Sequence, residues 1–236
     1  MVLRDQIIAI IYRSLLFIFG LSALIIVGIS DSMAGPLNAF RKYGNLLTLL
    51  SVLMVLFEII FNGISLSKGR KRMPSGVYPP IMFLLLSLEI GLTIAHPLYC
   101  FFGDLTYFSG GERNFYTLFI TLLFPIFFLG DWLLFGEKGN LKARHLLDIP
   151  LLPILYYLFS YLNHLIRGDD IKYATVIFDE KTFIGNPSLP ALFGENSGWN
   201  GVVISTFSIL SIYIATGIII FFLGKLLSSP NFYKES

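Results

Sequence analysis

The sequence has little with which to build a surface that faces water. Charged residues fill 14% of its 236 positions, against about 25% in an ordinary soluble domain. Hydrophobic residues make up 55% of the chain, and the mean hydropathy is +0.75. This excess of apolar side chains predicts an integral membrane protein whose outer surface contacts lipid.

Cysteine is almost absent, because Cys100 is the only one in the chain. A single thiol excludes an intramolecular disulfide and a cysteine-rich metal site. The three histidines do not have the spacing of a zinc site, so we expect neither a metal nor a cofactor. A net charge of +2 without a basic soluble segment argues against nucleic-acid binding. The remaining class of partner is membrane lipid.

Long apolar runs are abundant. A helix needs about 20 apolar residues to cross about 30 Å of hydrocarbon. Six runs meet this length, at about 6–30, 45–67, 78–103, 115–135, 146–166 and 199–227. The first is too long for the core of a signal peptide, so we expect it to be retained. The expected fold class is all-α: a polytopic membrane protein, with residues 1–236 forming one bundle of six transmembrane helices.

The charges between these runs predict the orientation of the chain. Basic residues are retained near the cytoplasmic ends of spans. They gather in the second and fourth loops, whereas the fifth loop is acidic: Lys68, Arg70, Lys71, Arg72, Lys138, Lys142 and Arg144 against Asp169, Asp170, Asp179, Glu180 and Glu195. Both termini are therefore expected in the cytoplasm.

Several ionisable residues fall inside the expected spans, where hydrocarbon disfavours them. Arg13, Glu58, Asp131 and Asp148 lie toward the cytoplasmic side. We interpret these four as structural, because buried ion pairs between them would fix the register of neighbouring helices.

A second polar group lies in the outer half of the expected bundle. Glu89, Thr93, His96 and Cys100 are spaced by four, three and four residues, which places them on one helical face. Thr48 lies roughly 5 Å below the outer end of its span, while His96 and Thr121 lie roughly 10 Å below theirs. The depths predict a shared cavity, although small polar residues also act as packing contacts between membrane helices.

Three segments carry a family resemblance. FPIFFLGDWLLFGEKGNL, PILYYLFSYLNHLIRG and KYATVIFD resemble the bacterial Pr6Pr family of six-span membrane proteins. These are distant relatives of the androgen-induced lipid hydrolases, which are threonine hydrolases of fatty acid esters of hydroxy fatty acids. The resemblance implies a bacterial plasma-membrane protein with a threonine nucleophile early in the second span and a histidine in the fourth.

The threonine has a counterpart here, and the histidine does not. Thr48, within YGNLLTLL, stands where the family has its threonine. In FITLLFPIFF, Ile120 and Thr121 occupy the places where the histidine would stand. The family's tyrosine-proline-tyrosine signature is also replaced, by YATVIFD.

These residues suggest a lipid ester hydrolase in which Thr48 attacks the ester carbonyl. A threonine hydroxyl needs a base, and the hydroxyl of Thr121 cannot serve near neutral pH. His96 is the expected base, with Glu89 orienting it through Thr93. Asn45, or the backbone amides that begin the second span, would stabilise the oxyanion.

Two other hypotheses remain open. In the first, Cys100 acts as a thiolate nucleophile in acyl transfer, since it lies one helical turn from His96. In the second, the chain is a non-catalytic lipid-binding protein that keeps the hydrolase fold without the family histidine. A serine-hydrolase GxSxG motif is absent from the sequence.

Overall fold

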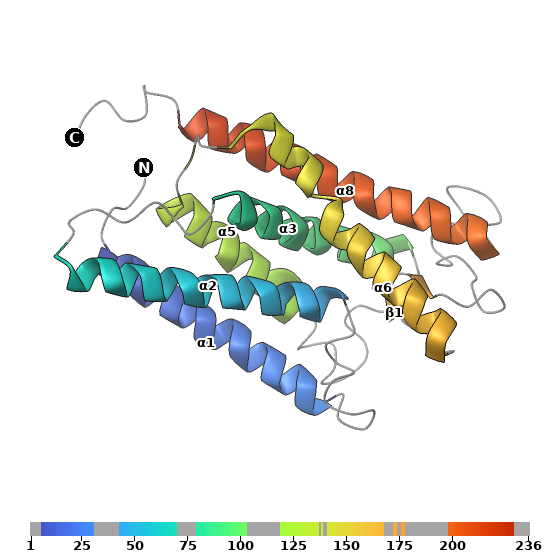
Figure 1. Cartoon of the computed structure of the whole chain (residues 1–236), viewed down its shortest axis with the longest axis horizontal. Coiled ribbons are helices and arrows are strands. Elements are labelled where there is room, and N and C mark those ends of the chain that lie inside the picture. The colour runs from blue at the N-terminus through green and yellow to red at the C-terminus, as the bar shows by residue number, and fades with distance from the viewer. Residues whose placement is uncertain are drawn as a thin grey trace.

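The computed structural model describes residues 6–30, 43–69, 79–102, 119–136, 138, 141–167, 172–173, 176–177 and 198–228. The helices are α1 (Gln6–Ser30), α2 (Tyr43–Ser67), α3 (Pro79–Phe102), the π-helix η3 (Phe119–Leu123), α5 (Phe124–Phe135), the 3-10 helix η4 (Ala143–Asp148), α6 (Leu151–Arg167) and α8 (Gly198–Leu227). Two short strands, β1 (Lys172–Tyr173) and β2 (Val176–Ile177), pair antiparallel. The predicted all-α class is confirmed, and Figure 1 shows the long helices side by side.

Neighbouring helices pack antiparallel and hold their register through specific contacts. Between α1 and α2, Gln6 Nε2 lies 3.4 Å from Ser65 Oγ near one end, and a Cβ on Gly20 would lie 2.5 Å from Val52 farther along. Between α3 and α8, a Cβ on Gly91 would overlap the ring of Tyr213. Glycine therefore lets these helices approach more closely than a larger side chain would allow.

The bundle is apolar outside and partly polar inside. Among the described residues, three helices are long and apolar enough to cross a membrane, Gln6–Ile29, Tyr43–Ser67 and Ile209–Leu227, and Pro79–Ala95 and Phe119–Phe135 are shorter apolar helices. Large aliphatic side chains such as Ile11 and Leu15 of α1 are more than half exposed. Arg13 on the same helix is 2% exposed. This arrangement is that of a membrane protein, whose outer surface contacts lipid.

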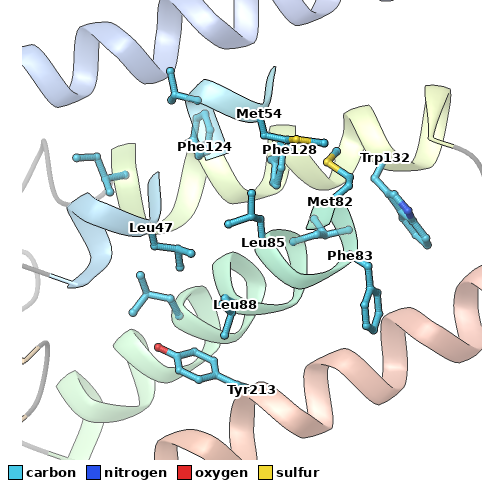
Figure 2. Packing of buried hydrophobic residues seen from close by; sticks show 14 of the residues in the cluster. Leu47, Met54, Met82, Phe83, Leu85, Leu88, Phe124, Phe128, Trp132 and Tyr213 are labelled. Carbon is cyan, nitrogen blue, oxygen red and sulfur yellow. The ribbon is translucent and has the colours of Figure 1, made fainter. Parts of the chain in front are cut away.

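The interior is filled by side chains from most of the described helices. Figure 2 shows Leu47 of α2, Leu85 of α3, Phe128 of α5 and Tyr213 of α8 gathered in one core. Leu47 and Phe128 have no exposed surface. Leu47 directly precedes Thr48 on α2, so Thr48 lies at the level of this core.

The expected run at 115–135 forms two kinds of helix over its described part. The π-helix η3 ends at Leu123, and α5 follows with Pro125 in its first turn. Proline has no N–H with which to bond the carbonyl four residues earlier, here that of Thr121. The missing bond accounts for the wider turn around Thr121.

The expected run at 146–166 differs from the structure at its start. Residues 143–148 form η4, and α6 begins only at Leu151, after Pro150, which is favoured in the first turn of a helix. Asp148 consequently lies in η4 rather than in a membrane-length helix. At 17 residues, α6 is about 25 Å long.

Candidate active site

The polar stripe of α2 faces the bundle interior. Thr48 and Ser51 have no exposed surface, Glu58 is 5% exposed and Asn62 is 1% exposed. Spacings of three and four residues keep such side chains on one helical face. Thr48 therefore points away from lipid, as a nucleophile in an enclosed site must.

Glu89 of α3 lies opposite the outer part of this stripe. Its side chain is fully buried, and its carboxyl faces the hydroxyls of Thr48 and Ser51. Thr48 Oγ1, Ser51 Oγ and both Glu89 carboxyl oxygens nevertheless lack a hydrogen bond of acceptable geometry among the described residues. The interior thus holds four oxygens whose hydrogen-bonding capacity is unused, which is rare for buried polar atoms.

The register between α2 and α3 places Glu89, rather than His96, beside Thr48. A Cβ on Gly44 would lie 3.2 Å from Leu92 Cδ2, so these positions are level. From that level His96 lies one turn along α3, and Thr48 lies one turn along α2 in the opposite direction. At 1.5 Å per residue, the two are separated by about 12 Å along the helix axes. The side chains of His96 and Cys100 lie outside the described residues.

The other residues expected around His96 have different roles. The Thr93 hydroxyl donates to the carbonyl of Glu89, 2.9 Å away on its own helix, so this hydroxyl does not carry a contact from the Glu89 carboxyl to His96. Asn45 is 8% exposed and lies in the first turn of α2, three residues before Thr48. Its place agrees with a role near the Thr48 hydroxyl.

Thr121 lies close to the level of Thr48. A Cβ on Gly20 would lie 2.6 Å from the Phe124 ring and 2.5 Å from Val52, which sets Phe124 and Val52 at one depth. Both α2 and α5 run antiparallel to α1, so they run parallel to one another. Thr121, three residues before Phe124 and 7% exposed, is therefore within about one helical turn of Thr48 in depth.

No family model, no curated protein and no solved structure matches this chain. Within the described ranges, no group of three or more histidine, cysteine, aspartate or glutamate side chains is arranged to hold a metal ion.

A separate ionic cluster lies toward the other end of the bundle. Arg13 of α1 donates from Nε to Asp131 Oδ1 at 2.8 Å and from Nη1 to Glu58 Oε2 at 3.0 Å. The three side chains are between 1% and 7% exposed. The structure thus brings together three of the four residues expected to form buried ion pairs.

Asp148, the fourth of those residues, is not part of the cluster. Its side chain is 52% exposed and its Oδ2 lies 3.2 Å from His145 Nδ1 within η4. The expectation of burial was wrong because Pro150 starts α6 later than the apolar run suggests.

Lys138, just beyond α5, adds a positive charge near Asp131. Burial lowers the pKa of Lys138 to about 8, and the Asp131 carboxylate opposes that shift.

Two features of the site were not predicted from the sequence. Ser51 was not among the expected site residues, and Glu89 was expected to orient His96 rather than to face Thr48. A signal for Ser51 was available in the spacing, since Thr48 and Ser51 lie three residues apart and share a helical face. The direction in which Glu89 points depends on the register between α2 and α3, which the spacing does not specify.

Proposed function

We propose that this chain is an intramembrane lipid ester hydrolase with Thr48 as its nucleophile, similar to the Pr6Pr family that its sequence resembles. The observation that carries the proposal is the Thr48 hydroxyl, fully buried in the bundle and facing a carboxyl, with no hydrogen-bond partner among the described residues. A hydroxyl that serves only as a packing contact would be expected to bond its own helix, as Thr216 does to Ile212.

The chemistry would be acyl transfer in two steps. Thr48 Oγ1 attacks the ester carbonyl while a base takes its proton, and the alcohol leaves with a proton as the acyl-threonine forms. Water then releases the fatty acid and regenerates the hydroxyl. Asn45, or the backbone amides that begin α2, would stabilise the oxyanion. The proposed substrate class is a fatty acid ester, which is the class that the family resemblance implies.

Labelling with a fluorophosphonate tests this proposal directly. Such a reagent forms a phosphorus–oxygen bond to an activated hydroxyl and releases fluoride. Purified protein in detergent should be labelled at Thr48, as mapped by mass spectrometry of its peptides, and added lipid ester should protect it. Labelling at another residue, or none at all, would contradict the assignment of Thr48.

A second candidate is a non-catalytic lipid-binding protein. It is favoured by one observation: Thr121 stands where the family histidine is expected and lies near the depth of Thr48, so the family's base is replaced at that place. A binding protein should copurify with lipid, as measured by mass spectrometry of an extract, and should not be labelled by the fluorophosphonate.

We further propose six spans in the plasma membrane of a bacterium, with both termini in the cytoplasm. Support comes from one end of the bundle, where α1 and α3 begin and α2, α5 and α8 end (Figure 1). Basic residues on described segments gather at this end: Lys68, Lys138, Lys142, Arg144 and Lys225. Retention of basic residues makes this end cytoplasmic.

Cysteine accessibility checks the orientation. We expect a cysteine at Ser75, placed in a Cys100→Ala background, to react with a membrane-impermeant maleimide only after the cells are opened. A cysteine at Glu195, in the acidic fifth loop, is the matched control and should react in intact cells. Labelling of Ser75→Cys from outside intact cells would reverse the proposed topology.

A further inference from the structure

We infer that Glu89 is a catalytic residue, the proton acceptor for Thr48. This inference rests on the proposed function and assigns the base that the fourth span lacks. The geometry that points to it is the juxtaposition of the Glu89 carboxyl with the Thr48 and Ser51 hydroxyls, all three side chains having no exposed surface.

Position favours Glu89 over His96. A general base must lie within hydrogen-bond reach of the hydroxyl or one water away. The Glu89 carboxyl already faces the Thr48 hydroxyl. The backbone of His96 lies about 12 Å from that of Thr48 along the axes, whereas Glu89 lies near the level of Thr48.

The lack of other partners for the Glu89 carboxyl also favours Glu89 as the base. Neither of its oxygens is held by a hydrogen bond of good geometry among the described residues, so their lone pairs are free to accept a proton. Among the described lysines and arginines none pairs with it; Arg13 bonds Glu58 and Asp131 instead. Glu58 and Asp131 thus share one counter-cation, Arg13, whereas Glu89 contacts no described lysine or arginine.

The proton transfers balance through both steps. Glu89 takes the proton of Thr48 Oγ1 as the bond from Oγ1 to the acyl carbon forms, and it returns that proton to the departing alkoxide as the ester carbon–oxygen bond breaks. In the second step Glu89 takes a proton from water, whose oxygen attacks the acyl-threonine. It then protonates Thr48 Oγ1 as the fatty acid leaves. Ser51, facing the same carboxyl, is a positioning residue for it.

The closing experiment compares Glu89→Gln with His96→Ala, using hydrolysis of a fatty acid ester of a hydroxy fatty acid by purified full-length protein. Glutamine keeps the shape of glutamate but is not a base. Glu89→Gln should lower the rate about 100- to 10,000-fold, as removal of a general base does. His96→Ala should lower it less than tenfold, and Glu89→Asp should recover part of the Glu89→Gln loss. Thermal unfolding of each variant checks that the fold is intact.

The possible outcomes distinguish the role of Glu89 as the base from the hydrolase function on which that role rests. Hydrolysis that needs Thr48 but persists in Glu89→Gln, or is abolished in His96→Ala, would overturn Glu89 as the base and leave the hydrolase standing. An inactive wild type, or one unaffected by Thr48→Ala, would remove the proposed function and this inference together. If Glu89→Gln unfolds, recovery of hydrolysis in a folded Glu89→Asp supports the role, and its absence overturns it.

Discussion

Arg13→Met should destabilise the protein by about 3–5 kcal/mol, the range measured when one partner of a buried ion pair is removed. Methionine fills a similar volume but leaves Glu58 and Asp131 as two interior carboxylates without their counter-charge. Asp131 is the more affected, since it has no exposed surface and its Oδ2 already lacks a hydrogen-bond partner among the described residues. Thermal unfolding in detergent, with the fraction of aggregated protein as a second readout, measures the loss.

The triple variant Arg13→Met, Glu58→Gln, Asp131→Asn is the matched control for charge. It removes all three ionic groups and should regain most of the stability lost in Arg13→Met, because the cost lies in uncompensated charge rather than in lost attraction. A triple variant no more stable than Arg13→Met would show that the contacts of Arg13 with its neighbours, including the Phe135 ring 5.9 Å away, matter more than charge balance.

The helices were predictable from the sequence because membrane thickness fixes their length. The bounds of α1 and α8 lie within one residue of the expected runs, and α2 begins at Tyr43 rather than at residue 45. Hydropathy failed at residues 146–150, since it counts apolar residues and does not register the helix start at Pro150. Asp148 was misplaced for that reason alone.

The ionic cluster was predictable in kind, because hydrocarbon leaves a buried charge few alternatives to an ion pair. Its membership required three-dimensional information, since Arg13 has two acidic partners on two different helices.

The site around Thr48 was harder to predict from the sequence than the ionic cluster. Spacing identifies which side chains share a face, but the sliding of one helix against another decides which faces meet. One turn is about 5.4 Å, more than the reach of a hydrogen bond. The contact between Gly44 and Leu92 sets this register, and nothing in the sequence specifies it.

Thr48→Ala should abolish fluorophosphonate labelling and lower ester hydrolysis by at least about 10⁴-fold, because no acyl-enzyme intermediate can form without the hydroxyl. Alanine removes only the hydroxyl and one methyl group from a fully buried position, so the fold should survive. Thr48→Ser keeps the hydroxyl beside Glu89 and should retain labelling. Thr216→Ala is the matched control: it removes a threonine that is 4% exposed on α8 and whose hydroxyl bonds its own helix.

A gain-of-function variant at Thr121 extends this comparison, because Thr121 lies near the depth of Thr48. If the bundle accepts the family's arrangement, Thr121→His in the Glu89→Gln background should restore about 100-fold or more of the lost hydrolysis, since it supplies a base near the level of Thr48. That gain should vanish when Thr48→Ala is added, because a base without its nucleophile has no proton to take. Hydrolysis that stays at the wild-type rate in Thr48→Ala would end the threonine mechanism. The alternative would then be a thiolate mechanism at Cys100. That mechanism requires Cys100→Ala to abolish the hydrolysis.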